Sequence, residues 1–275
     1  MQSAVRDRLI GSNPCEGVRL PRNRKQAHHD SVISLEELTG QLLPVVPPRY
    51  RALVALAGGT GLRWGECVGL RWSEVDLTAH CVKVVRVAVE VAGTVTTKPY
   101  PKTRAGLREV PLPPFVVAEL QHHKDAYSAG KSGEVFTNSE NGPVRRTLFR
   151  SRVWRPALVR ARLLGKVVHV APDAFHASWL DSDGVEHEAS FVSEREAVKH
   201  VAKVAAGGMT FHGLRRSYAT HLVSNNVAIN DVAAVMGHER FSTTLDIYTK
   251  RPKGRNGRVL DAFPDDDDGE TEPSR

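Results

Sequence analysis

Residues 58–66 read Gly-Gly-Thr-Gly-Leu-Arg-Trp-Gly-Glu, a stretch that ends a buried helix and places Arg63 just beyond a glycine turn. Glycine adopts backbone conformations that other residues avoid, so the main chain and the guanidinium of Arg63 can both approach a phosphate. Arg63 is therefore a candidate phosphate ligand. On this segment alone, a surface arginine beside a helix start is the better explanation, because most arginines are exposed.

Helical signals lie on both sides of this stretch. Ser34 and Glu37 form a capping box that begins one helix, and Pro47-Pro48 opens a second that ends at Gly58-Gly59. Later helices follow Pro113-Pro114 and an Asn-Gly turn. The expected helices cover residues 34–43, 48–59, 113–129, 144–164 and 212–248, the last with breaks at 225–226 and 237.

Strand signals are fewer and fall between the helices. Residues 80–91 are rich in β-branched side chains, Gly93 interrupts them, and short strands follow at 94–97 and 108–112. These segments predict one small antiparallel sheet. The fold class is therefore mainly α with a small antiparallel β-sheet (α+β).

Residues 165–209 do not follow the helical pattern and are interpreted as an insertion. Strands are expected at 174–180 and 185–192 around an Asp183-Gly184 turn, followed by a helix with a capping box from Ser193 to Glu196. The result is an inserted β-hairpin/helix module. Its formal charge is −3, from four Lys and Arg against seven Asp and Glu, so we expect it to contact protein and not DNA.

Composition limits the partners of the chain. The 275 residues, 41% of them hydrophobic, can bury one core with a small appendage. The net charge is +7, and the tail from Pro264 to Arg275 contributes −5, which leaves +12 elsewhere. Such a balance fits a polyanionic partner, although basic residues also serve solubility alone. The expected divisions are a linker at 1–30, a catalytic domain at 31–260 and an acidic disordered tail at 261–275.

Cysteine usage and hydropathy indicate the compartment. Cys15, Cys67 and Cys81 include no CxxC pair and are expected to be reduced thiols. The apolar runs are too short to cross a bilayer, so we expect no membrane partner. The chain is predicted to be cytoplasmic, and associated with the nucleoid if its partner is DNA.

Two further groups of residues could handle a phosphodiester. His212 and Arg215 are three positions apart, hence on one face of a helix, where both can contact one phosphate. Gly237-His238 adds a donor, and Tyr248 adds a phenol ten residues later. Each alone has an ordinary explanation, a solvated histidine or a half-buried core tyrosine. A metal site from His212, His221 and His238 is disfavoured, since the first two lie on opposite faces of a helix.

Taken in order, these motifs resemble the catalytic domain of the tyrosine recombinase, or phage integrase, family. The matching motifs are Thr-Gly-x-Arg-x-x-Glu around Arg63, Pro101-Lys102-Thr103, His212 with Arg215, Gly237-His238, and Tyr248 after Thr243-Thr244. The resemblance covers about residues 35–251 apart from the insertion. It implies the tyrosine-recombinase catalytic fold with an inserted module, and a site-specific recombinase that integrates or excises a mobile element.

The resemblance also implies roles for these residues. Tyr248 would attack the scissile phosphate and form a 3′-phosphotyrosyl link, while Arg63 and Arg215 would neutralise charge on the phosphoryl oxygens. His238 would donate a further hydrogen bond, and Lys102 would protonate the departing 5′ oxygen.

His212 would accept the proton of the tyrosine, and Glu66 would be a structural partner of nearby donors. No metal or cofactor is expected. The expected partners are double-stranded DNA at attachment sites, a homotetramer in the synapse, and accessory or excisionase proteins.

Two alternatives remain open. Residues 4–22 look like the end of a core-binding domain, so the chain would be a fragment and could be a catalytically silent DNA-binding module. A type IB topoisomerase shares the nucleophile chemistry and the fold, but the Gly237-His238 and Thr243-Thr244 contexts favour integrases.

Overall fold

The structure is a computed structural model that describes residues 1–18, 32–99 and 107–237. The chain divides into two units, Met1–Asp30 and Ser31–Arg275. In its described part, the first unit forms one short helix, α1 (Gln2–Arg6), with no buried residue. The second unit holds the hydrophobic core and all the other elements.

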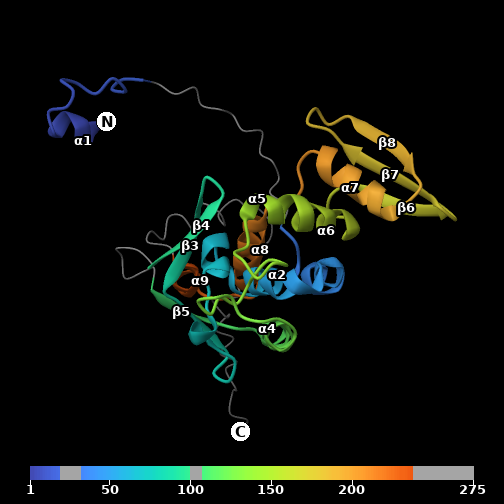
Figure 1. Ribbon diagram of the computed structural model, residues 1–275, viewed down its shortest axis with the longest axis horizontal. Helices are drawn as coiled ribbons and strands as arrows, with labels where there is room; N and C mark the ends of the chain where they lie inside the picture. The colour runs from blue at the N-terminus through green and yellow to red at the C-terminus, as the bar shows by residue number, and fades with distance from the viewer. Residues whose placement is uncertain (19–31, 100–106, 238–275) are drawn as a thin grey trace, which may run out of the picture. The chain divides into compact units, whose positions relative to one another are not determined.

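Helices account for most of the regular secondary structure in the described part of the second unit (Figure 1). The α-helices are α2 (Pro48–Thr60), α3 (Trp64–Val68), α4 (Pro114–Ala126), α5 (Arg146–Phe149), α6 (Arg155–Arg160), α7 (Glu194–Val204), α8 (Phe211–Ser224) and α9 (Ile229–Met236). The π-helical and 3₁₀ segments are η1 (Glu37–Leu42), η2 (Leu43–Val45), η3 (Trp72–Glu74) and η5 (Arg150–Trp154).

The strands form three small antiparallel sheets. Their order is β1-β2-β5, β3-β4 and β6-β7-β8. The strands are β1 (Val75–Asp76), β2 (Cys81–Val84), β3 (Arg86–Val91), β4 (Thr94–Pro99), β5 (Arg108–Pro111), β6 (Lys166–Ala171), β7 (Ala174–Leu180) and β8 (Glu186–Phe191). A mainly helical fold with small antiparallel sheets is confirmed.

The β-branched run at 80–91 is divided between two sheets, which corrects the prediction of a single sheet. Val84 pairs with Arg108 in one sheet, and Arg86 pairs with Pro99 in the other. Val85 is the one residue between them, so the chain changes sheets there. A uniform run of strand-forming residues carries no local signal for such a change.

The first two helices begin as expected, but the second ends later. The main-chain N–H of Ser34 donates to Glu37 (2.7 Å) and that of Glu37 to the Ser34 hydroxyl (3.1 Å), which confirms the capping box. The prediction that α2 ends at Gly58-Gly59 is wrong, since the helix continues through Thr60. The left-handed residue that stops it is Gly61, with φ of +64°.

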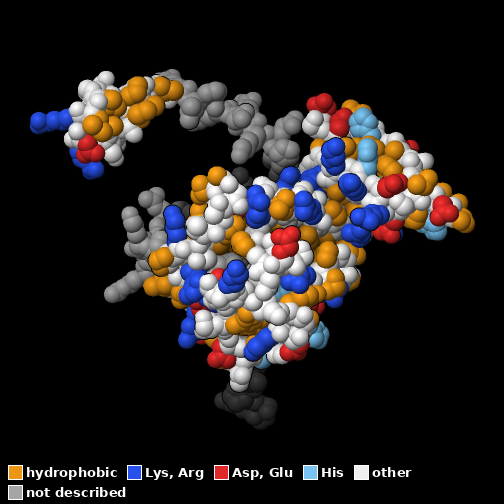
Figure 2. Space-filling model, in the orientation of Figure 1, with side chains coloured by type: hydrophobic (Ala, Val, Ile, Leu, Met, Phe, Trp, Pro, Cys, Tyr) orange, Lys and Arg blue, Asp and Glu red, His pale blue; other side chains and the backbone are white. Residues whose placement is uncertain are grey.

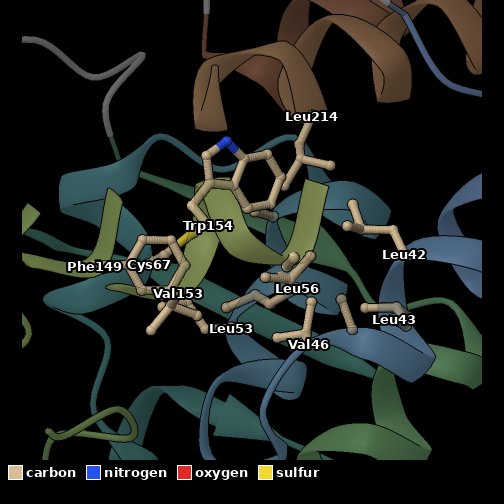
Figure 3. Packing of buried hydrophobic residues seen from close by; sticks show 14 of the residues in the cluster. Leu42, Leu43, Val46, Leu53, Leu56, Cys67, Phe149, Val153, Trp154 and Leu214 are labelled. Atoms are coloured by element: carbon tan, nitrogen blue, oxygen red, sulfur yellow. The ribbon is translucent and has the colours of Figure 1, made fainter. Parts of the chain in front are cut away.

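The main hydrophobic core lies in the second unit (Figure 3), beside a smaller cluster of Ala219, Val232 and Met236 between α8 and α9. Leu53 and Leu56 of α2, Trp154 of η5 and Leu214 of α8 are all at most 2% exposed. Burying such side chains stabilises the fold by about 1.5–3 kcal/mol each. The Trp154 indole N–H donates to the carbonyl of Met209 (2.7 Å), so its one polar atom is also satisfied.

The inserted module has three strands and not two. Helix α7 covers one face of the β6-β7-β8 sheet, where Ala177 and Val201 are fully buried. Ser193 caps α7 by accepting from the N–H of Glu196 (3.3 Å). Strand β6 was not predicted, because the turn between β6 and β7 has no glycine. Asp173 takes the left-handed conformation there, with φ of +55°.

Two features of the described residues concern the cysteines and the helices. Cys15, Cys67 and Cys81 are all free thiols. In residues 1–18, 32–99 and 107–237, no helix has the length and apolar character that a membrane span requires.

Gly59 is expected to tolerate no side chain. A Cβ there would lie 2.4 Å from Val116 Cγ2 and 2.8 Å from Phe115 Cζ, at the contact of α2 with α4. Gly59→Ala should lower the free energy of unfolding by about 1–3 kcal/mol in urea denaturation, through overpacking.

Gly40→Ala is the matched control for Gly59→Ala. A Cβ at Gly40 meets nothing within 4 Å, and Gly40 lies in the helical segment η1. The same substitution should there be neutral or stabilising by up to about 1 kcal/mol. Equal destabilisation by the two variants would contradict the packing explanation.

Candidate active site

Arg63 lies at the turn between α2 and α3. Gly61 ends α2 in a left-handed conformation, and Arg63 then takes the N-cap position of α3. A Cβ at Gly61 would lie 2.6 Å from the Tyr218 ring, so α8 packs directly against this turn. The glycine is thus required by both conformation and space, and it places the start of α3 beside α8.

The Glu66 carboxylate lies at the centre of the site and has no exposed side-chain surface. It accepts hydrogen bonds from the Arg63 N–H (2.8 Å) and from Arg63 Nη1 (2.9 Å). Arg108 on β5 adds two more, from Nη1 (3.3 Å) and Nη2 (2.8 Å). A buried carboxylate needs such partners, and the expectation that Glu66 is a structural partner of nearby donors agrees with this geometry.

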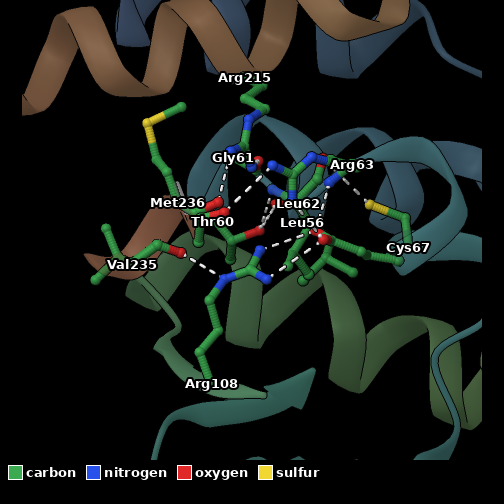
Figure 4. A network of polar contacts seen from close by, with 12 residues as sticks. Leu56, Thr60, Gly61, Leu62, Arg63, Cys67, Arg108, Arg215, Val235 and Met236 are labelled. Atoms are coloured by element: carbon green, nitrogen blue, oxygen red, sulfur yellow. Dashed lines mark hydrogen bonds and ion pairs between the residues drawn. The ribbon is translucent and has the colours of Figure 1, made fainter. Parts of the chain in front are cut away.

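Three arginines also hold the end of α9 (Figure 4). Arg108 Nε donates to the carbonyl of Val235 (2.7 Å), and Arg215 Nη2 to that of Met236 (2.5 Å). Arg63 Nη2 donates to the next carbonyl, that of Gly237 (3.4 Å). The last carbonyls of a helix have no partner within it and carry partial negative charge, so they suit guanidinium groups.

Arg215 also joins α8 to the glycine turn. It is 2% exposed, and its Nη1 donates to the carbonyl of Gly61 (2.7 Å). One guanidinium therefore contacts both the turn before Arg63 and the end of α9. Among the described residues, the guanidinium groups of Arg63, Arg108 and Arg215 meet at the end of α9, and Glu66 is the carboxylate that Arg63 and Arg108 contact. The excess positive charge suits a phosphate.

Aromatic packing holds His212 beside Arg63. Phe211, which begins α8, contacts Trp64, which begins α3, with ring centroids 5.0 Å apart and planes at 87°. Phe149 packs on both rings. Since Arg63 precedes Trp64 and His212 follows Phe211, this edge-to-face contact fixes the two polar residues relative to each other.

A cavity of about 640 Å³ adjoins these residues, with Arg63, Arg146 and His212 in its lining. Burial lowers the pKa of His212, and the positive charges of Arg215, Arg63 and Arg146 lower it further. The imidazole is therefore neutral at pH 7 and able to accept a proton. Such a base beside a set of guanidinium groups can deprotonate a nucleophile that attacks a bound phosphate.

The structure brings together Arg63, His212 and Arg215 of the predicted site residues. Lys102, His238 and Tyr248 lie outside the described residues, as does the predicted acidic tail. Among the residues described, no three His, Cys, Asp or Glu side chains are grouped where they could hold a metal ion.

Sequence reasoning missed Arg108 and Arg146. Arg108 contacts Glu66 across 42 residues and Val235 across 127, and it sits in a short strand with no motif around it. Arg146 lies in a stretch with six other arginines, at 145–162, and nothing in the spacing singles it out. The signal for both is spatial and appears only in the folded chain.

Comparison with known proteins identifies the family. The sequence profile of the phage integrase family matches residues 41–255. A XerC-like tyrosine recombinase of Caldanaerobacter subterraneus is 26% identical over 262 residues, which are 90% of this chain and 58% of that protein. A putative prophage phiRv2 integrase of Mycobacterium tuberculosis is 26% identical over 264 residues, 94% of this chain and 57% of that protein. The chain thus spans less than two thirds of these relatives.

Solved structures share the fold. The Tn1549 transposon integrase in complex with circular intermediate DNA superposes with a TM-score of 0.65 at 16% identity, over 95% of this chain and 75% of that one. XerA recombinase gives a TM-score of 0.51 at 17% identity, over 92% of this chain and 67% of that one.

Replacing Glu66 by glutamine should destabilise the fold strongly. The change removes the carboxylate charge that pairs with Arg63 and Arg108 while leaving both guanidinium groups in place. We expect the free energy of unfolding to fall by about 3 kcal/mol, as when one partner of a buried ion pair is lost. Glu37→Gln alters a glutamate that also accepts an N–H three residues earlier, but at the surface, and should cost less than about 1 kcal/mol. Similar losses in the two variants would contradict the central role of Glu66.

The pKa of His212 should be measurably low. In an NMR titration of the imidazole, we expect a pKa below the usual 6.5, since burial and three arginines disfavour the charged form. Arg146→Ala should raise that pKa by removing one positive charge. Arg152→Ala removes an arginine from the same helical stretch but should leave it unchanged. A His212 pKa at or above 6.5 in the wild-type chain would refute this electrostatic account.

Proposed function

Because the chain belongs to the phage integrase family, we propose that it carries the catalytic domain of a site-specific DNA recombinase. It cleaves and rejoins DNA strands through a 3′-phosphotyrosyl intermediate, and so integrates or excises a mobile element. The observation that carries this proposal is the grouping of Arg63 and Arg215 beside a neutral His212, because metal-free phosphoryl transfer needs fixed cations and a base.

The proposed reaction exchanges one phosphodiester for another. The phenol oxygen of Tyr248 attacks the scissile phosphorus while its proton passes to His212. The bond from phosphorus to the 5′ oxygen breaks, and Lys102 gives that oxygen its proton. The new phosphotyrosyl bond keeps the energy of the old one, so rejoining needs no nucleotide cofactor.

Cations stabilise the charge that develops during this exchange. Arg63 and Arg215 face the phosphoryl oxygens, and His238 donates a further hydrogen bond. Glu66 contacts no substrate in this proposal, because its carboxylate is buried and hydrogen-bonded to Arg63 and Arg108. The roles of Lys102, His238 and Tyr248 rest on their sequence motifs.

The proposed substrate is double-stranded DNA at attachment sites. The charge of +12 before the acidic tail supports it, and so does the shared fold with the Tn1549 integrase, solved in complex with DNA. Recombination joins two duplexes, so we propose four protomers in the synapse, with accessory or excisionase proteins as further partners. Such an enzyme works where its DNA lies, in the cytoplasm at the nucleoid.

The domain divisions are part of the same proposal. Residues 1–30 are a linker and remnant of a core-binding domain, 31–260 are the catalytic domain with the module at 165–209, and 261–275 are an acidic tail. The boundary at Asp30 and Ser31 between the two structural units supports the first division.

Tyr248→Phe tests the function directly. The variant should form no covalent adduct with a nicked suicide substrate on a denaturing gel, yet it should bind duplex DNA nearly as well as the wild type. The phenol oxygen is the proposed nucleophile, whereas affinity comes mainly from phosphate contacts. Tyr127→Phe is the control, since Tyr127 ends α4 and contacts His123 outside the site, and it should keep the adduct. An adduct in Tyr248→Phe, or none in the wild type, would refute the assignment.

A further inference from the structure

A second cation-lined cavity lies where the inserted module meets the catalytic body. It has a volume of about 590 Å³ and is formed by η5, the start of α6 and the C-terminal part of α7. Five of its lining residues are cations, and none of its described lining residues is Asp or Glu. The cations are Arg150, Arg152, Arg155, Lys199 and Lys203. We name this cavity the junction hollow.

Arg155 builds one wall of the junction hollow. Its side chain is buried and donates to three main-chain carbonyls at the end of α7, from Nε to Ala202, from Nη2 to Ala205 (2.5 Å) and from Nη1 to Gly207 (3.0 Å). These carbonyls carry only partial negative charge, so the guanidinium remains a net cation. The module is thereby fixed to α6 with its lysines facing the arginines of η5.

The charges of the module are unevenly distributed, which its net charge of −3 does not show. Lys199 and Lys203 lie one helical turn apart on α7 and line the junction hollow. Four of the seven acidic residues, Asp181, Asp183, Glu186 and Glu188, lie on β8 or on its connection to β7. In Figure 2, Lys and Arg side chains gather where α5, α6 and α7 adjoin. The wall that the module contributes to the junction hollow is therefore basic, whereas Glu194, at the start of the same helix, pairs with Arg160 of α6 (3.7 Å).

The junction hollow and the active-site cavity are both lined by residues of one helical stretch. Arg146 lines the active-site cavity and Arg150 lines the junction hollow. The two are four residues apart, about 6 Å along a helix axis. The five positive charges that line the junction hollow repel one another, and a bound anion would reduce this repulsion. A polyanion with successive phosphates can contact both the active-site cavity and the junction hollow. A single small anion cannot reach both.

We infer that the junction hollow binds backbone phosphates of the DNA segment that flanks the scissile phosphate, so that the inserted module is part of the DNA-binding surface. This inference rests on the proposed function for the identity of the polyanion. It replaces the expectation, drawn from net charge, that the module contacts protein alone. Lys199 and Lys203 contact phosphates next to those contacted by Arg150 and Arg152.

The test compares two double variants with the same change in charge. Lys199→Ala/Lys203→Ala removes two lysines of the junction hollow. Lys131→Ala/Lys166→Ala removes two exposed lysines that do not line it, one of them on the module. Duplex DNA binding is measured by fluorescence anisotropy over a series of salt concentrations. Each phosphate contact contributes about 0.9 to the slope of log affinity against log salt, so the first variant should flatten the slope by about 2 and the second by much less.

The other outcomes separate this inference from the proposed function. Equal slopes in the two variants would overturn the inference, and adduct formation by the wild type would then leave the proposed function intact. If the wild type neither binds duplex DNA nor forms an adduct, both fail. If inorganic phosphate raises the melting temperature of the wild type but not of Lys199→Ala/Lys203→Ala, while the DNA slope is unchanged, the hollow binds a small anion and the inference is wrong. A lower melting temperature with an unchanged slope would mark the lysines as structural only, and would overturn it too.

Discussion

The burial of one carboxylate organises this fold. Glu66 has no exposed side-chain surface, so its charge must be balanced inside the protein. Arg63 and Arg108 provide that balance, and they come from α3 and β5, which are distant in sequence. The same two guanidinium groups reach the end of α9, where Arg215 joins them. A helix, a sheet and the chain segment that leads to His238 are therefore positioned by one electrostatic requirement.

Sequence reasoning could group the candidate site residues that lie close together along the chain. Arg63 with Glu66, and His212 with Arg215, are three residues apart, and a helix turn brings such pairs together. Arg108 and Arg146 could not be predicted, because the site residues they influence are distant from them in sequence. The helix end at Gly58-Gly59 was misplaced for a related reason, since those glycines serve the contact with Leu38 and α4 and not a turn.

Some features of the inserted module could be predicted from its sequence and others could not. Its existence and capped helix were predictable, because Ser193 and the Asp-Gly turn are local signals. Strand β6 was not, since its turn uses Asp173 at positive φ. The net charge favoured a protein contact for the module, whereas the arrangement of its charges supports the proposed DNA contact. A net charge does not say where the charged side chains lie. The fold shows that Lys199 and Lys203 line the same cavity as the arginines of η5.

Arg155 and Arg215 share a mode of attachment, since both donate to main-chain carbonyls. A carbonyl acceptor survives every side-chain replacement that leaves the backbone in place. The side chains at positions 202, 205 and 236 can therefore change without breaking the hydrogen bonds of either arginine. A carboxylate partner, by contrast, would have to be conserved together with its arginine. Anchors of this kind let a lineage change much of its sequence while the charged groups stay in position.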